Sequence, residues 1–152
     1  MRTTLIPLAH RHIRRSAQVA AARAELELIR DELAAALRQD GWDDEESFRV
    51  LVCADEAMAN ALSHGSGTGG RIDVRFAVSE RRALVIVGDA RGTASELRMP
   101  AGPPPDSSEH GRGLILMHAL ADRFRVWRRP AGTLVALAVF SDSHRATKGA
   151  AR

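Results

Sequence analysis

The sequence predicts an α+β fold, a two-layer sandwich in which helices cover one face of a mostly antiparallel sheet. The first half of the chain has apolar residues at the three- and four-residue spacing of amphipathic helices. Further along, short strand-like segments follow one another in pairs across tight turns, which makes each pair antiparallel. Helices that precede and separate such hairpins pack on one face of the sheet. The 152 residues suffice for a single domain with a hydrophobic core.

The first elements are a short strand and a long helix. Residues 2–8 are predicted as a strand that ends near Pro7. Residues 16–39 are predicted as a helix with one apolar stripe and one charged face, and Gly41 is its expected stop. The stripe consists of Val19, Leu26, Ile29, Leu33 and Leu37.

A second helix follows almost at once. Asp43 or Asp44 is expected to cap it, because an Asp side chain accepts hydrogen bonds from the first-turn N–H groups. Two glutamates in that turn suit the positive end of the helix dipole. The helix should run to about Ser63 and lead into a glycine turn over residues 65–70.

The second half predicts two hairpins separated by a loop and a helix. Residues 71–78 alternate polar and apolar side chains, and residues 83–87 are continuously apolar, as expected for a half-buried strand and a central strand. Residues 90–110, rich in Pro, Gly and Ser, are long enough to indicate a lid or a disordered loop. The remaining elements are a helix at 111–121 and strands at 124–127 and 133–140. The domain therefore spans residues 1–140, and residues 141–152 are expected to form a disordered tail.

Composition excludes several classes of protein. No apolar run approaches the roughly 18–20 residues of a membrane span, and no secretory signal is recognisable. Cys53 is the only cysteine, so no intrachain disulfide can form, which fits a cytoplasmic protein. The net charge is +3 and the pI about 10.3, but the arginines are dispersed among acids and there is no Tyr. We therefore expect neither nucleic acid nor membrane as a partner.

The second helix ends in a polar stripe. In DEAMANALSHGSG (residues 55–67), Glu56, Asn60 and His64 recur every four residues, and Glu56 and Asn60 should share one face. An amide and a carboxylate oxygen are hard donors suited to Mg²⁺, and a carboxylate there can also accept a proton. A solvated helix face explains the same pattern.

Three further motifs have a structural interpretation, and for two of them a functional one stands beside it. In residues 110–114 (HGRGL), two glycines at a helix start can leave backbone N–H groups free for a phosphate, or can serve as a hinge. Asp89, after a buried strand, can accept a hydrogen bond from an exocyclic amine, or can shape a turn. Gly132-Thr133 taken alone is a hairpin turn.

Together, in this order, these motifs resemble the GHKL ATPase superfamily (Bergerat fold), and within it the anti-sigma-factor serine/threonine kinases similar to RsbW and SpoIIAB. The resemblance covers about residues 3–140. It is carried by the N box at 56–64 (EAMANALSH), the second glycine box at 111–117 (GRGLILM), residues 119–123 (ALADR) and Gly132-Thr133. It implies a mobile lid that closes over bound ATP.

The resemblance also implies roles for residues of the N box and of the first glycine box, which is at 89–92 (DARG) in this sequence. Asn60 would hold Mg²⁺, and Glu56 would be the general base. Asp89 would bind the adenine amino group, with Gly92 in the same glycine box.

The remaining nucleotide contacts follow from the second glycine box and the last turn. Gly111, Arg112, Gly113 and Leu114 would surround the phosphates, and Thr133 would lie near the nucleotide. The first glycine box departs from the family pattern, because Arg91 stands where the family has glycine and Gly92 comes one residue late. This departure puts nucleotide affinity in question more than the fold.

By the same resemblance, the chain would transfer a phosphoryl group from ATP to a serine of an anti-anti-sigma protein of STAS type. It would also sequester a sigma factor and act as a homodimer. The alternative is a regulatory module of the same fold that binds nucleotide or partner without catalysis.

Overall fold

The computed structural model describes residues 11–18, 22–65, 71–89, 112–129 and 132–142. The elements in chain order are β1 (Arg11–Gln18), α1 (Ala22–Gln39), α2 (Asp44–Asn60), the π-helical turn η2 (Ala61–Gly65), β2 (Arg71–Ser79), β3 (Arg82–Asp89), α3 (Arg112–Leu120), β4 (Arg123–Arg129) and β5 (Gly132–Phe140). None of the helices in these ranges has the length and apolar character needed to cross a lipid bilayer.

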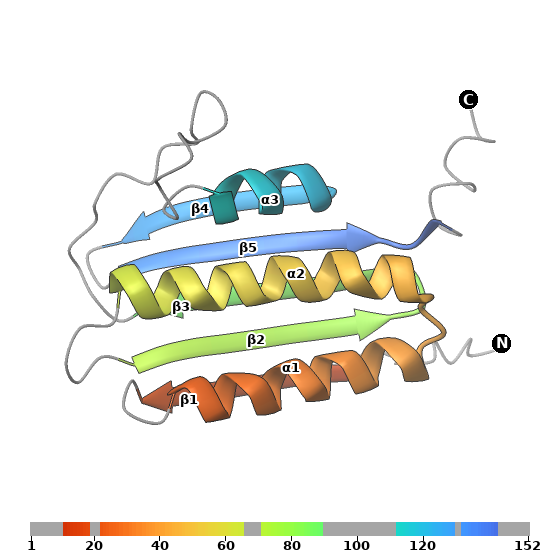
Figure 1. Ribbon diagram of the computed structural model, residues 1–152, viewed down its shortest axis with the longest axis horizontal. Helices are drawn as coiled ribbons and strands as arrows, with labels where there is room; N and C mark the ends of the chain where they lie inside the picture. The colour runs from red at the N-terminus through yellow and green to blue at the C-terminus, as the bar shows by residue number, and fades with distance from the viewer. Residues whose placement is uncertain (1–10, 19–21, 66–70, 90–111, 130–131, 143–152) are drawn as a thin grey trace, which may run out of the picture.

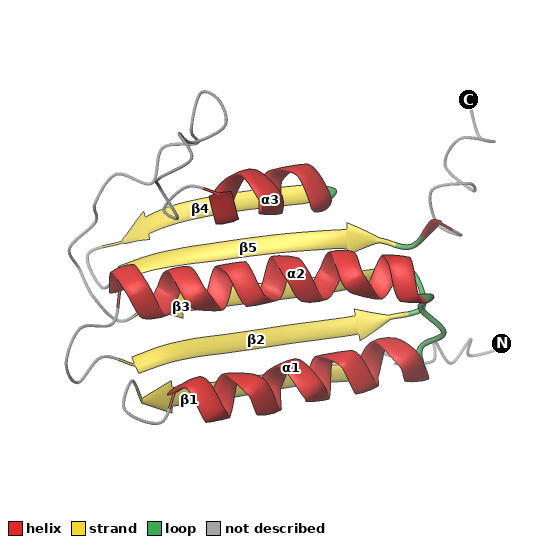
Figure 2. Ribbon diagram, viewed as in Figure 1, coloured by secondary structure: helices red, strands yellow, loops and turns green. Residues whose placement is uncertain are grey.

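The described elements form two layers, a five-stranded sheet and three helices on one of its faces (Figures 1 and 2). The strand order is β1-β2-β3-β5-β4, and all four pairings are antiparallel. Helix α1 lies over β1 and β2, α2 lies over β3 and β5, and α3 packs beside α2 near β4. The predicted α+β sandwich with a mostly antiparallel sheet is confirmed.

The start of the first helix was predicted wrongly. Residues 2–8, predicted as the first strand, lie outside the described residues, while Arg11–Gln18 forms β1 and α1 begins only at Ala22. The predicted helix over 16–39 thus included the end of a strand. An edge strand pairs through its backbone, here with β2 from Arg11↔Val78 to Gln18↔Arg71. Such pairing needs no apolar alternation, so the sequence RHIRRSAQ gave no strand signal.

The core lies between the helices and the sheet. Strand β2 buries every second residue, as its alternation predicted, and α1 and α2 contribute the apolar stripes that cover it. The predicted turn at Glu80 and Arg81 connects β2 to β3, and β4 pairs with β5 as the closing hairpin. The largest fully buried side chains are Leu33, Leu37, Ile72, Met117, Leu137, Val50, Val74, Val78, Val85, Val87, Val139 and Cys53.

Helix α1 stops where the sequence predicted. Gly41 has φ +78°, a left-handed conformation that glycine adopts without steric cost. Its N–H donates to the carbonyl of Arg38 (3.2 Å), and the N–H of Trp42 donates to the carbonyl of Leu37 (3.1 Å). This is the Schellman pattern, and the side chains of Trp42 and Leu37 are both buried beside it.

Helix α2 is capped by Asp43, whose Oδ1 accepts the N–H of Glu46 at 2.7 Å. Replacing Asp43 by Ala should lower the free energy of unfolding by about 1 kcal/mol, because a first-turn N–H loses its acceptor. Urea denaturation measures this loss. Asp44→Ala, which removes a first-turn charge but no cap, is the control and should cost less; an equal loss would refute the assignment of the cap.

The first two residues of the predicted tail are bonded to the domain. Ser141 is buried, and its N–H donates to the carbonyl of Arg81 at 3.1 Å. The N–H of Asp142 donates to Oε1 of Glu46 on α2. Residues 143–152 lie outside the described residues, so the disordered tail remains a prediction for them.

Candidate functional site

The polar stripe lies at the C-terminal end of α2. Glu56 and Asn60 are one helical turn apart and both are partly exposed, while the neighbouring residues Cys53, Ala57 and Met58 are buried in the core. The structure therefore places Glu56 and Asn60 at the boundary between core and solvent, where both side chains can reach a ligand.

The helix widens directly after Asn60 into the π-helical turn η2. A π-turn bonds each carbonyl to the N–H five residues later, and such turns occur frequently at functional sites. The four-residue spacing from Asn60 to His64 therefore does not continue the α-helical stripe. The side chain of His64 lies outside the described side chains, and its role stays a prediction.

The first turn of α3 lies directly on the stripe. A Cβ added to Gly113 would overlap Oε2 of Glu56, would lie 3.3 Å from its Cδ, and would be 3.5 Å from Nδ2 of Asn60. A side chain at position 113 would have to displace the Glu56 carboxylate. The structure thus joins the N-box residues Glu56 and Asn60 to Gly113 of the second glycine box, which comes more than 50 residues later in the chain.

The other residues of the second glycine box differ in their surroundings. Arg112, the first residue of α3, is exposed, whereas Leu114 is buried in the core together with Met117. Leu114 was predicted to contact the nucleotide, and in the structure its side chain packs in the core. Gly92 and Gly111, also predicted as nucleotide contacts, lie outside the described residues.

A second pair of predicted residues meets across two strands. Oδ1 of Asp89, at the end of β3, accepts the backbone N–H of Thr133 on β5 at 3.0 Å. Gly132, with φ +129°, begins β5 in a conformation that favours glycine. The carboxylate of Asp89 is therefore held by the neighbouring strand, at the position that the sequence predicted.

Both pairs lie at the same end of the sandwich. In Figure 1 the C-terminal end of α2, the start of α3, the end of β3 and the start of β5 all lie on the left of the molecule. Turn η2 also contacts β3 and β5, which links the two pairs. Four segments thus bring carboxylate, amide and helix-start groups together at one end of the sheet.

The buried thiol of Cys53 is one turn before Glu56 and one turn after Arg49. Burial raises the pKa of Cys53 to about 11. The charge of Arg49 has a smaller effect that lowers this pKa, and the charge of Glu56 has a smaller effect that raises it. The thiol is therefore neutral at pH 7 and is no nucleophile there.

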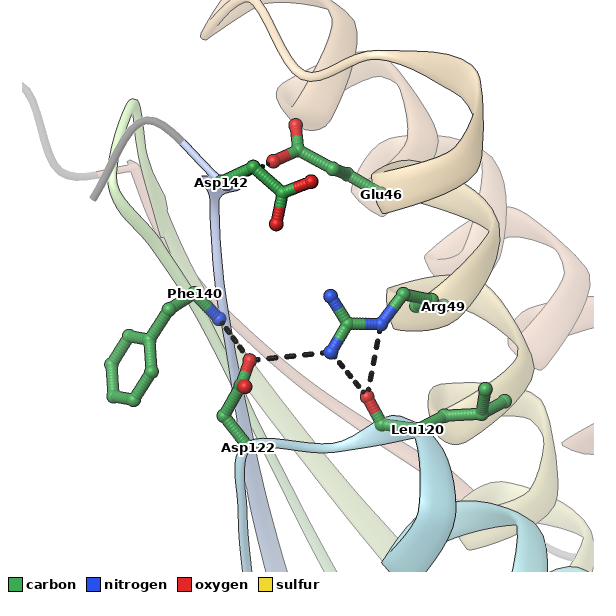
Figure 3. A network of polar contacts seen from close by, with 6 residues as sticks. All are labelled: Glu46, Arg49, Leu120, Asp122, Phe140 and Asp142. Atoms are coloured by element: carbon green, nitrogen blue, oxygen red, sulfur yellow. Dashed lines mark hydrogen bonds and ion pairs between the residues drawn. The ribbon is translucent and has the colours of Figure 1, made fainter. Parts of the chain in front are cut away.

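A polar network that was not predicted from the sequence joins α2 to α3 and β5, nearer the N-terminal end of α2 (Figure 3). Arg49 donates to the carbonyl of Leu120 at the end of α3 and to the carboxylate of Asp122, which also accepts the N–H of Phe140. One feature of the sequence could have pointed to Arg49. It precedes Glu56 by two helical turns and so lies on the same side of α2. Its partners are more than 70 residues away in the sequence.

Comparisons with known proteins identify the family of this chain. Residues 19–139 match the family model of the histidine kinase-like ATPase domain. The serine-protein kinase RsbW of Bacillus licheniformis is 32% identical over 118 residues, which cover 71% of this chain and 72% of that protein. The serine-protein kinase RsbW of Bacillus subtilis is 30% identical over 128 residues, which cover 78% of this chain and 79% of that protein.

Solved structures share the fold. The RsbU and RsbW domains of Rv1364c from Mycobacterium tuberculosis align with a TM-score of 0.59 at 23% identity, covering 87% of this chain and 32% of that one, so this chain spans about a third of it. The histidine kinase domain from Erythrobacter litoralis EL346 aligns with a TM-score of 0.53 at 19% identity, covering 82% of this chain and 63% of that one. From the family match and the RsbW identities, the chain belongs to the histidine kinase-like ATPase family, in the branch of the RsbW serine-protein kinases.

Proposed function

We propose that this chain binds Mg-ATP at the end of the sandwich where α2 and α3 meet, and transfers the γ-phosphoryl group to a serine of a STAS-type anti-anti-sigma protein. The carrying observation is the contact of Gly113 with Glu56 and Asn60. It joins a helix start, which suits phosphate, to a carboxylate and an amide, which suit proton transfer and Mg²⁺. The names of the RsbW relatives support the same reaction class.

The adenine and the phosphates would be bound by different segments. Asp89, oriented by the N–H of Thr133, presents a carboxylate to which the adenine amino group can donate. Arg112 and Gly113 form the first turn of α3, and the positive end of the helix dipole favours an anion there. Gly111 and Gly92 complete the proposed phosphate and adenine contacts from outside the described residues.

The residues present fit a magnesium ion. The Glu56 carboxylate and the Asn60 amide group both approach Gly113, so a carboxylate and an amide side chain lie near one another. The oxygen of such an amide is a hard donor that suits Mg²⁺. No group of three His, Cys, Asp or Glu side chains that could hold a metal occurs within the described ranges. That composition suits Mg²⁺, which commonly takes one or two protein ligands and otherwise water and substrate phosphates. When bound, the ion would neutralise charge on the phosphates.

Glu56 would act on the incoming serine. As the oxygen of the serine hydroxyl bonds to the γ-phosphorus and the bond to ADP breaks, the hydroxyl proton passes to the Glu56 carboxylate. The protein contributes mainly position and charge stabilisation in such a transfer. The lid predicted for residues 90–110, which lie outside the described residues, would keep water from replacing serine as the acceptor.

The partners belong to the same proposal. We infer that the chain also sequesters a sigma factor, and that it works in the cytoplasm as a homodimer. Size-exclusion chromatography with light scattering tests the dimer. Co-purification with the sigma factor, and its release when the STAS protein is added, tests the regulatory role.

A non-catalytic module of the same fold is the second candidate, and Arg91 favours it. An arginine in place of the family glycine in the first glycine box can narrow the adenine pocket. Calorimetric titration with ATP and ADP, with and without Mg²⁺, followed by a transfer assay with the STAS protein, separates the two. Binding with transfer supports the kinase; binding without transfer supports the module; no binding at millimolar nucleotide refutes both nucleotide roles.

Gly113→Ala should lower the transfer rate by at least about tenfold while leaving the fold intact, because the added methyl group displaces the Glu56 carboxylate, the flexible end of a side chain. Gly41→Ala is the matched control. The same methyl group there touches nothing within 4 Å, but φ +78° makes it strained. It should lower the melting temperature and leave transfer unchanged. Full activity in Gly113→Ala would contradict the site geometry.

A further inference from the structure

Helices α2 and α3 contact each other at both ends of α3. Glu56 lies near Gly113 at one end, and Arg49 binds the carbonyl of Leu120 at the other. Each helix spaces its two contact residues by seven positions, about 10 Å along the axis. The helices therefore run antiparallel, and a contact at one end of α3 constrains where the other end lies.

The contacts at the far end are specific (Figure 3). The Leu120 carbonyl accepts hydrogen bonds from Nε of Arg49 at 3.2 Å and from Nη2 at 2.7 Å. Nη2 also lies 3.3 Å from Oδ2 of Asp122, which accepts the N–H of Phe140 on β5 at 2.7 Å. The side chains of Arg49 and Asp122 are only 18% and 23% exposed.

These contacts suit the end of a short helix. The last carbonyls of a helix have no N–H partner within it, and a cation beside them is favourable for the helix dipole. Arg49 binds Leu120 with two donors of a planar guanidinium, and Asp122 connects that guanidinium to β5. The C-terminal end of α3 is thereby attached to both α2 and the sheet.

We propose that Arg49 is a positioning residue for the nucleotide site, and that through α3 it holds Gly113 against Glu56 and Asn60. The expected effect of Arg49 on ATP binding rests on the proposed function, whereas its expected effect on the position of α3 does not. Helix α3 has only nine residues, of which Gly113, Leu114 and Met117 are buried. Without the Arg49 contact, the C-terminal end of α3 keeps its packing on the core and the hydrogen bond from the Asp122 N–H to the Ala138 carbonyl, but it loses this link to α2. A shift of α3 along α2 then moves the first-turn N–H groups away from the phosphates.

A second ion pair on α2 provides a matched control. Arg30 on α1 donates to Asp55 on α2 at 2.9 Å, with both side chains more than 40% exposed. It joins α2 to α1 and does not involve α3. Arg30→Ala therefore removes an arginine–aspartate pair of α2 while leaving both contacts with α3 intact.

The test compares the wild type with Arg49→Ala, Arg49→Lys and Arg30→Ala. We expect Arg49→Ala to raise the KM for ATP about tenfold with a smaller fall in kcat, since a loss within this range is usual for residues that act through a packed network. Arg49→Lys keeps the charge but loses the two-donor contact, and should fall between wild type and Arg49→Ala. Arg30→Ala should keep the wild-type KM.

Hydrogen–deuterium exchange without nucleotide gives a second readout that does not depend on the proposed activity. Arg49→Ala should speed exchange of the amides in residues 115–117 of α3, and Arg30→Ala should not. Unchanged exchange and KM in Arg49→Ala would overturn the proposal. Equal changes in both variants would reduce Arg49 to a general stabilising residue. If the wild type binds no ATP, the proposed function fails while the exchange comparison still decides whether Arg49 positions α3.

Discussion

Replacing Glu56 by Gln should reduce phosphoryl transfer to the STAS protein by about 10²- to 10⁴-fold, the usual contribution of a general base. Gln has nearly the same shape as Glu, so the contact with Gly113 is kept while the proton acceptor is lost. Affinity for Mg-ATP should stay within a few-fold of wild type. A single-turnover assay with labelled ATP, paired with calorimetry, measures both quantities.

The outcome decides whether the Glu56 carboxylate takes part in phosphoryl transfer. Normal binding with lost transfer assigns proton transfer or serine orientation to its carboxylate. Glu56→Ala, which also removes the contact with Gly113, should lose transfer at least as completely. Transfer at the wild-type rate in Glu56→Gln would exclude the carboxylate as the base.

Asn60→Ala should abolish measurable Mg-ATP binding while the protein stays folded. Asn60 is partly exposed at the end of α2, so its truncation leaves no buried polar group without a partner. Asn60→Asp is the matched comparison, because it keeps a hard oxygen donor and should retain more of the magnesium-dependent affinity. Calorimetry with ATP in Mg²⁺ and in EDTA measures the effect.

Two results would speak against the magnesium role of Asn60. Unchanged Mg-ATP affinity in Asn60→Ala would remove it from the site. An equal loss in Mg²⁺ and in EDTA would mean that the amide contacts the nucleotide itself. Thermal unfolding of the variant, expected near the wild-type temperature, shows that lost binding is not lost structure.

Much of the fold could be predicted from local sequence. The spacing of Leu33 and Leu37 predicted α1, and Gly41 and Asp43 predicted its end and the start of α2, because these signals act within a few residues. The hairpins of β2 with β3 and of β4 with β5 followed from alternation and tight turns. Strand β1 was missed because its pairing with β2 depends on a distant segment.

The site was only partly predictable for the same reason. The helical period placed Glu56 and Asn60 on one face, but no local pattern brings Gly113 onto them, and that expectation came from the family resemblance. The bond between Asp89 and Thr133 joins strands 44 residues apart. The π-helical turn after Asn60 and the contact of Arg49 with Leu120 follow from tertiary packing, which the sequence pattern does not encode in a readable form.

The most direct test of the account is the backbone amide NMR spectrum of the ¹⁵N-labelled protein during titration with Mg-ATP. If Mg-ATP binds at the proposed site, the largest changes in amide chemical shift occur at the end of the sandwich where α2 and α3 meet, at Asn60, Asp89, Gly113 and Thr133. Changes confined to other parts of the protein, or none at millimolar Mg-ATP, would contradict it.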